Sequence, residues 1–192
     1  MEFTQEQIDR HNALTKAGTA IVKSHALIEG GKARGAPGFF ERRQLKEGIR
    51  LFGEALKMNP AGWSSMWALG KLHQRLGEHA DALKWFAEAA RIKPDQPDVL
   101  REAGIAALNL GAKNEALRLC FAAVQLAPDD LGLQSNLALA YLITGDDVHA
   151  EECATVAVSR APQDGASRAV LALVQDVRHG KRQRPERLGE AT

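Results

Sequence analysis

Histidines and cysteines are the residues of this chain best suited to nucleophilic, acid–base or metal chemistry. The six histidines lie at positions 11, 25, 73, 79, 149 and 179. None of them stands at a metal-ligand spacing from another histidine or from a cysteine, so the sequence contains no zinc motif. Cys120 and Cys153 lie within apolar helical patterns, which is typical of packed thiols in a reducing compartment. The sequence therefore predicts no metal, no cofactor and no cysteine nucleophile.

Two other patterns could serve catalysis, and both have simpler interpretations. The glycine-rich stretch 30–38 suggests a phosphate-binding loop, but it lacks the Gly-Lys-Ser/Thr ending and follows a predicted helix rather than a strand. It is better interpreted as a connector. Ser64 and Ser65 precede a predicted helix and read as caps, while His73 is expected to be a packed core residue. We therefore expect no enzyme activity; a nucleotide-dependent enzyme using loop 30–38 remains the alternative.

Charge and hydropathy exclude further classes. The chain has 25 Lys and Arg against 24 Asp and Glu, for a net charge of +1, so nothing in the whole-chain charge indicates a nucleic-acid or membrane partner. The first residues do not form a secretion signal, and no run of about 18 apolar residues occurs. We expect a cytoplasmic protein without membrane insertion. Nucleic-acid binding through the basic stretch 181–187 remains a minor alternative.

The elements that would position any site are organised by a 34-residue repeat. Pro60, Pro94, Pro128 and Pro162 recur at this interval. Aligning 63–96, 97–130 and 131–164 brings further residues into register, numbered from the start of each block. Position 8 holds Gly70, Gly104 and Ala138; position 15 holds Gly77, Gly111 and Gly145; position 20 holds Ala82, Ala116 and Ala150; and position 27 holds Ala89, Ala123 and Ala157. A repeat of this length indicates stacked helical units.

Each block is expected to be a hairpin of two helices. Small residues at positions 8 and 20 allow the helix backbones to approach closely, and the glycine at position 15 can adopt the left-handed conformation that ends a helix. The proline at position 32 cannot continue the second helix and disfavours helical geometry at the residue before it. The chain therefore turns into the next block.

These residues resemble the tetratricopeptide-repeat family. The best copy contains Leu69-Gly70, Gly77, Ala82, Phe86, Ala89 and Pro94, and Tyr141 supplies the family's aromatic residue at position 11 in the third copy. Cys120 and Ala154 stand where the family has phenylalanine. The resemblance implies an all-α, right-handed superhelix of antiparallel hairpins whose concave groove binds proteins or peptides.

We expect a single domain over residues 1–180. Its first hairpin, 5–60, would be interrupted by loop 30–38, with a first helix at 5–29 whose apolar stripe contains Leu14, Ala17, Ile21 and Ile28. Three regular repeats follow at 63–96, 97–130 and 131–164. An amphipathic helix at 166–179 would cap the array, and residues 181–192 would form a disordered basic tail.

By the resemblance, positions 2, 5, 9, 12 and 13 of each first helix line the groove. The partner-binding residues that we select from this stripe are Trp67, Lys71, Gln74, Arg75, Arg101, Ile105, Leu108, Ser135, Leu139 and Leu142. Trp67 is expected to be the apolar anchor, while Lys71, Arg75 and Arg101 would select acidic groups. The family's clamp for the carboxylate end of chaperones requires more cations than the scattered Lys71 and Arg101, so chaperone docking is disfavoured.

The leading hypothesis is a non-enzymatic adaptor or scaffold that holds a peptide or helix of a partner protein in this groove. The alternative is a self-associating regulatory or structural module, in which a second copy or the chain's own insertion loop closes the groove. A homo-oligomer is therefore possible. The sequence does not identify the partner.

Overall fold

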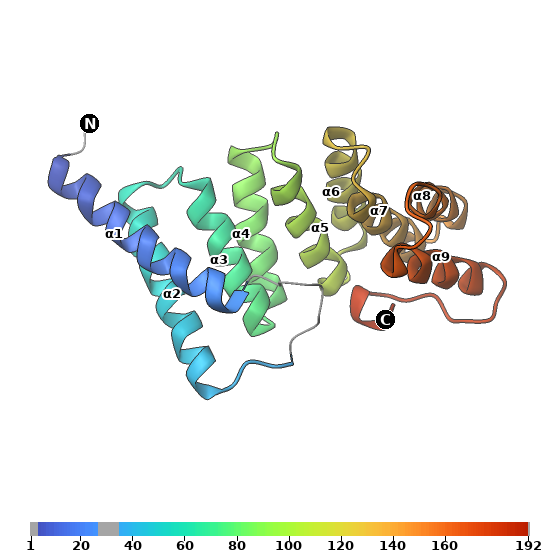
Figure 1. Ribbon diagram of the computed structural model, residues 1–192, viewed down its shortest axis with the longest axis horizontal. Helices are drawn as coiled ribbons and strands as arrows, with labels where there is room; N and C mark the ends of the chain where they lie inside the picture. The colour runs from blue at the N-terminus through green and yellow to red at the C-terminus, as the bar shows by residue number, and fades with distance from the viewer. Residues whose placement is uncertain (1–3, 27–34, 192) are drawn as a thin grey trace. The chain divides into compact units, whose positions relative to one another are not determined.

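The computed structural model describes residues 4–26 and 35–191, and all regular secondary structure within those ranges is helical. The chain divides between Lys93 and Pro94 into two compact units, here called unit 1 and unit 2. Unit 1 is blue to green in Figure 1, and unit 2 is yellow-green to red. Within the described ranges, no helix is both long and apolar enough to cross a membrane.

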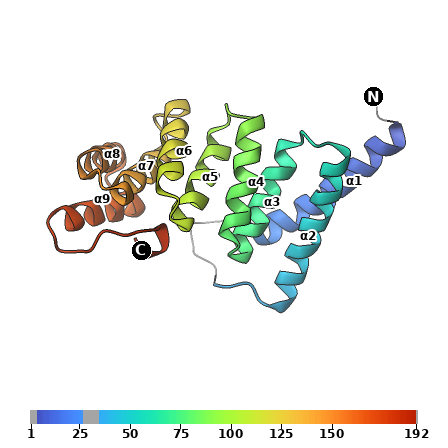
Figure 2. The ribbon, with the colours of Figure 1, turned by 180° about the vertical axis from the view of Figure 1, so that it is seen from behind.

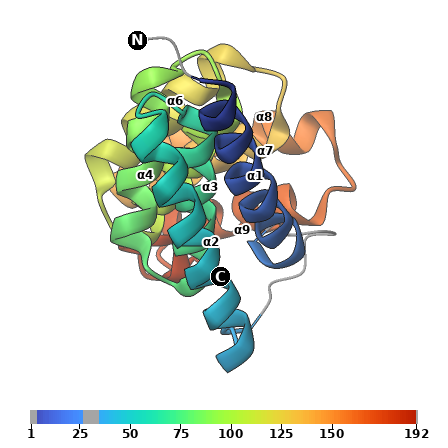
Figure 3. The same cartoon turned by 90° about the vertical axis from the view of Figure 1, so that its left-hand side faces the viewer.

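Unit 1 contains four α-helices and one π-helical turn. They are α1 (Gln5–Ile21), η1 (Val22–Ala26), α2 (Phe39–Met58), α3 (Trp63–Leu76) and α4 (His79–Ile92). Helices consecutive in the sequence pack against each other, and η1 also contacts α3. Figure 3 shows α1 running beside α2. The hydrophobic core of unit 1, to which η1, α2 and α3 contribute, includes Leu45, Phe52, Leu69 and Leu72, all 2% exposed or less.

Unit 2 contains two regular hairpins followed by a further helix and a short 3-10 turn. Its elements are α5 (Pro97–Leu110), α6 (Lys113–Leu126), α7 (Leu131–Thr144), α8 (Asp147–Arg160), α9 (Gly165–Arg178) and η2 (Leu188–Glu190). Helix α9 packs against both α7 and α8, and η2 contacts α5. Figure 2 shows the segment after α9 turning back along unit 2.

The repeat residues act as the sequence predicts. Helices α3, α5 and α7 end at Gly77, Gly111 and Gly145, whose φ angles of +80°, +75° and +98° lie in the left-handed region. The second helices end at Lys93, Ala127 and Ala161, each followed by a proline and each with a non-helical φ near −130° to −141°. The predicted all-α helical-repeat class therefore follows from local backbone preferences.

The first hairpin differs from expectation in its buried face. Of the predicted stripe, Ala17 is exposed, Leu14 and Ile21 are half-buried, and Ile28 lies outside the described residues. The buried positions are Gly18, Val22 and Ala26. Phe52 packs directly on the Gly18 backbone, where a Cβ atom would lie 2.7 Å from its ring. The π turn after Ile21 then shifts the register of the remaining residues, which a regular helical stripe could not anticipate.

Candidate functional site

The predicted site residues of unit 1 lie on α3 and are covered by neighbouring parts of the same chain. Arg75 pairs with Glu41 of α2, at 2.9 Å from Nε and 2.8 Å from Nη2 to Oε1, and its Nη1 donates to the Gly35 carbonyl at 2.8 Å. The Arg75 side chain is 14% exposed. Arg75, one of the three cations that were expected to select acidic partner groups, is therefore neutralised within unit 1.

Trp67 and Lys71 are similarly enclosed. The Trp67 ring packs against the hydrophobic core of unit 1, and its Nε1 atom has no hydrogen-bond acceptor within the described ranges. Lys71 is buried, with Nζ 6.0 Å from the centroid of the Trp67 ring. Gln74 is half-buried. Of the four residues predicted on this helix, none presents a fully exposed side chain.

The predicted site residues of unit 2 lie on α5 and α7, and most are interior. Leu108, Ser135, Leu139 and Leu142 are buried, and Ser135 Oγ lies 3.4 Å from Ser167 Oγ of α9. Because α9 packs on α7, the stripe that was expected to line an open groove is covered here by the chain itself.

Two predicted residues of α5 keep partial access to solvent. Arg101 pairs with Asp98 in its own helix and, at 3.4 Å, with Asp130. Ile105 is half-buried. Arg101 and Ile105, with Gln74 of unit 1, are therefore predicted site residues whose side chains are outside the cores and still partly accessible to solvent.

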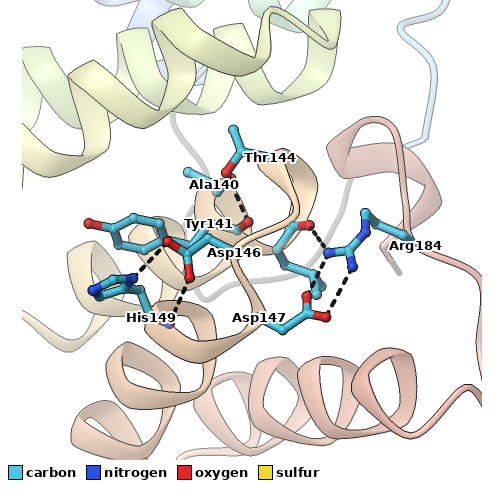
Figure 4. Close-up of polar contacts among 8 residues, drawn as sticks. Ala140, Tyr141, Thr144, Asp146, Asp147, His149 and Arg184 are labelled. Atoms are coloured by element: carbon cyan, nitrogen blue, oxygen red, sulfur yellow. Dashed lines mark hydrogen bonds and ion pairs between the residues drawn. The ribbon is translucent and has the colours of Figure 1, made fainter.

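The structure reveals a site that the sequence did not predict, centred on Arg184 (Figure 4). Arg184 donates from Nη1 to the Leu142 carbonyl at 2.6 Å and to Asp147 Oδ1 at 2.6 Å, and from Nη2 to Asp147 Oδ2 at 3.0 Å. The Leu142 carbonyl belongs to the last turn of α7, and Asp147 begins α8. One guanidinium thus adds a second donor to a helix-end carbonyl that already accepts the Gly145 N–H, and makes a bidentate pair with a carboxylate. Its hydrogen bonds hold the pKa of Asp147 below the ordinary value.

The residues after Arg184 follow the same edge of unit 2. Pro185 is buried, and Glu186 pairs with Lys113 at the start of α6. The carbonyl of Glu186 lies 3.4 Å from the position that a Cβ atom on Gly111 would occupy. We call the surface formed by Gly111, Lys113, Leu142 and Asp147 the turn edge, because these residues surround the α5–α6 and α7–α8 turns.

The turn edge changes the interpretation of the C-terminal residues. We expected 181–192 to be a disordered basic tail, whereas residues 181–191 lie against unit 2 in the structure, and residue 192 is outside the described residues. Two of the cations are already paired, Arg184 with Asp147 and Arg187 with Glu190. A carboxylate and a helix-end carbonyl offset the charge of Arg184, and burial of Pro185 excludes water from part of the contact. The pairing also weakens the case for nucleic-acid binding.

A second polar group lies beside the turn edge. His149 Nδ1 is 2.7 Å from Asp146 Oδ2, the His149 backbone N–H donates to Asp146 Oδ1 at 3.2 Å, and the Tyr141 ring stacks on the His149 ring with centroids 5.1 Å apart. Figure 4 shows the three side chains together. The backbone hydrogen bond lowers the pKa of Asp146, which caps α8. This arrangement secures the turn that carries Asp147.

The corresponding turn of unit 1 contains the described chain's nearest approach to a metal site. His73 Nδ1 lies 2.7 Å from Glu78 Oε2, and possible ligand atoms of His73, Glu78 and Asp81 lie within 4.8 Å of one another. Glu78 and Asp81 are exposed. The His73 side chain is 13% exposed, as expected for a packed residue. The His73–Glu78 hydrogen bond already accounts for this contact. We therefore interpret the three residues as part of the structure of the α3–α4 turn.

The cysteines are poor nucleophiles. Burial raises the pKa of Cys120 to about 12, and burial also raises the pKa of Cys153. Both thiols are therefore protonated at neutral pH, which disfavours thiolate chemistry at either position.

Comparisons with known proteins agree with the repeat. A family model described as tetratricopeptide repeat matches residues 34–97. No curated protein has significant sequence similarity to the chain. Among solved structures, MamA from Desulfovibrio magneticus, solved from residue 41 to its end, has a TM-score of 0.73 at 18% identity, with 90% of this chain and 86% of that solved chain covered.

Two further structures have the same fold. YrrB, described as a tetratricopeptide-repeat protein with an unusual peptide-binding site, has a TM-score of 0.65 at 15% identity, covering 78% of this chain and 77% of its own. A tetratricopeptide-repeat protein from Parabacteroides merdae has a TM-score of 0.69 at 14% identity, covering 91% and 68%. At such identities the likeness establishes the fold, and it confirms the predicted class.

Proposed function

We propose that this chain, a tetratricopeptide-repeat protein by its fold and by the family match over residues 34–97, is a non-enzymatic protein-interaction scaffold. Its proposed ligand is an extended segment of a partner protein, bound along the turn edge of unit 2. The observation that supports this proposal is that the turn edge already accommodates a segment of polypeptide, residues 184–190, in which the only regular structure is one 3-10 turn.

The contacts at the turn edge are ones that another polypeptide could make equally well. The Leu142 carbonyl and the Asp147 carboxylate require only a guanidinium, and Lys113 requires a carboxylate two residues later. The buried Pro185 adds an apolar contact between them. We therefore propose a partner segment that carries arginine, then a compact apolar residue, then an acid. The described peptide-binding site of YrrB, in the same fold, is consistent with such a role.

The residues predicted from the family's groove have a secondary place in this proposal. Arg101, Ile105 and Gln74 remain candidates for partner contact because they are only half-buried. The buried members of that set, such as Leu139 and Leu142, would support the binding surface without touching the partner.

The chain's own segment is held at the turn edge weakly enough for a partner segment to replace it. Arg184 and Asp147 are about one third and one quarter exposed, at 33% and 26%, so the ion pair contributes on the order of 1 kcal/mol. A tethered segment acts at an effective concentration in roughly the millimolar range. The chain's own segment should therefore compete with a partner, and weakening it should raise the partner's apparent affinity.

The test uses the full chain and a fluorescent peptide with the sequence of residues 181–191. We expect the Arg184→Ala protein, whose own segment is weakened, to bind the peptide with fluorescence anisotropy in the micromolar range. The unmodified protein should bind about tenfold more weakly because its own segment occupies the edge.

Two matched changes locate the contact. Adding Asp147→Asn to the Arg184→Ala protein should weaken peptide binding about fivefold, and a peptide carrying Arg184→Gln should bind the Arg184→Ala protein more weakly by a similar factor. Equal binding by the Asp147→Asn double variant would show that the peptide binds elsewhere. Failure of the Arg184→Ala protein to bind at all would refute the proposed ligand site.

A further inference from the structure

Unit 1 exposes an aromatic pair that nothing in the described part of the chain covers. Phe39 and Phe40 begin α2, are 78% and 79% exposed, and form an edge-to-face pair with ring centroids 5.6 Å apart. In Figures 1 and 3 this end of α2 projects beyond the ends of α3 and α4. Two adjacent phenylalanines with this exposure form an apolar surface of the kind that marks an interaction site.

The other end of α2 helps to form an apolar pocket of about 130 Å³. Its lining comes from the N-terminal half of α1 and the C-terminal end of α2, and consists of Gln7, Ile8, His11, Met58 and Asn59. A cavity of about 150 Å³ lined by apolar side chains can accept benzene. The pocket therefore has a suitable size and chemistry for one phenylalanine ring.

The two features cannot meet within one molecule. Phe39 is the first residue of α2 and Met58 is the last, so they lie about 30 Å apart along one helix of 20 residues. Every copy of the chain nevertheless carries both an exposed aromatic pair and an apolar pocket. The occupant to which this geometry points is the aromatic pair of a second copy.

Both surfaces carry exposed charged side chains. Arg43 and Lys46 lie exposed near Phe39 and Phe40, whereas Glu41 is already paired with Arg75. The exposed Glu6 and Asp9 of α1 flank the residues that line the pocket, and the exposed Arg10 and Lys57 lie beside the same residues. Glu6 and Asp9 thus supply carboxylates near the pocket for Arg43 and Lys46 of the other copy.

We propose that the chain associates head to tail, with Phe39 or Phe40 of one copy inserted into the Ile8, His11 and Met58 pocket of the next. The two contact surfaces differ, so the contact is heterologous and leaves a free pocket at one end and a free aromatic pair at the other. Association therefore extends to short chains as concentration rises. This proposal is independent of peptide binding at the turn edge.

The experiment measures mass by sedimentation equilibrium across the micromolar range. The unmodified protein is expected to exceed monomer mass increasingly with concentration. The double variant Phe39→Ser/Phe40→Ser loses the inserted group, and Ile8→Glu blocks the pocket at a residue that is 41% exposed and so tolerates change. Each variant alone should associate at least about tenfold more weakly.

Mixing the two variants provides the decisive measurement. The first variant retains its pocket and the second retains its aromatic pair, so an equimolar mixture should form a complex of two chains and nothing larger. Phe121→Ser, at a 48% exposed phenylalanine of α6, is the matched control and should leave assembly unchanged. An unmodified protein that is monomeric throughout, variants that still assemble alone, or a mixture that stays monomeric would each overturn the proposal.

Discussion

At the scale of single residues, two buried positions that face each other in each repeat vary in size in opposite directions. A Cβ atom on Gly70 would lie 2.5 Å from the Phe86 ring, and one on Gly104 would lie 2.8 Å from Cys120 Sγ. In the third repeat the same two positions hold Ala138 and Ala154, both fully buried. As the residue in the second helix becomes smaller, the first helix can carry a methyl group. The identity of each small residue therefore depends on its partner across the hairpin.

This packing predicts that Gly70→Ala destabilises the protein. Phe86 is completely buried and cannot move aside. The added methyl should therefore lower the free energy of unfolding by about 2 kcal/mol, even though alanine favours a helix more than glycine does. Gly53→Ala is the control, because no atom lies within 4 Å of its added Cβ and the change should stabilise α2 by up to about 1 kcal/mol. Urea unfolding measures both. A neutral Gly70→Ala would contradict the proposed contact.

Asp147 predicts a pH-dependent contribution to stability. Its folded pKa is lowered, chiefly by the hydrogen bond from Arg184, so its contribution is complete above the unfolded pKa of about 3.9 and is lost as pH falls through the folded value. Asp147→Asn should therefore lower the unfolding free energy by about 1 kcal/mol at neutral pH. The difference from the unmodified protein should disappear in acid.

Thermal unfolding as a function of pH measures this difference. Asp129→Asn provides the comparison, since Asp129 also pairs with an arginine, Arg160 at 2.5 Å, but is 88% exposed. Little effect is expected there at any pH. A constant Asp147→Asn penalty down to acid pH would mean that the carboxylate charge is not what stabilises the fold.

The sequence identified buried small residues more reliably than it identified exposed functional ones. Ala82, Ala116 and Ala150 were expected at helix contacts and are fully buried. Leu142 was assigned to a partner-facing stripe by its register but is fully buried. A helical register specifies which residues share a face, whereas whether that face is open depends on elements that are distant in sequence.

At the scale of elements, the helix ends are determined by glycine and proline. The repeat's glycines were predicted to end the first helices, and Gly77, Gly111 and Gly145 do so with positive φ. These residues succeed as predictors because their preferences are local to the backbone. The first hairpin was less predictable because its helix continues into a π turn, and residues 27–34 of the intervening stretch lie outside the described ranges.

The left-handed cap predicts that Gly77→Ala is destabilising through strain alone. No atom lies within 4 Å of the added Cβ, but the φ of +80° should cost an alanine about 1 kcal/mol. Gly165→Ala is the matched control, because its added Cβ is equally free and its φ lies outside the positive range; its effect should stay within about 0.5 kcal/mol. Chemical unfolding of the two variants separates backbone strain from steric conflict. Equal stabilities would argue against the strained cap.

At the scale of the whole molecule, the 34-residue period predicts contacts between neighbours in a repeat but not the return of the C-terminal segment. Arg184 and Asp147 are 37 residues apart, and nothing in their local sequence pairs them among 25 cations and 24 carboxylates. The proline, glycine and mixed charges around Arg184 give this segment the composition of a disordered tail, and composition alone led to that prediction. The site becomes visible only when α7 and α8 place a helix-end carbonyl beside a carboxylate.

The return of this segment predicts where Arg184→Ala acts. Losing the guanidinium removes one of the two donors to the Leu142 carbonyl and the partner of Asp147. Hydrogen exchange should therefore accelerate at the end of α7 and the start of α8, by about tenfold for a loss of 1.4 kcal/mol. Amides of α3 and α4, in unit 1, should exchange at unchanged rates. Arg160→Ala, which removes an exposed pair in the same unit, should change little. Uniform acceleration across both units would indicate a global loss of stability instead of a local contact at the turn edge.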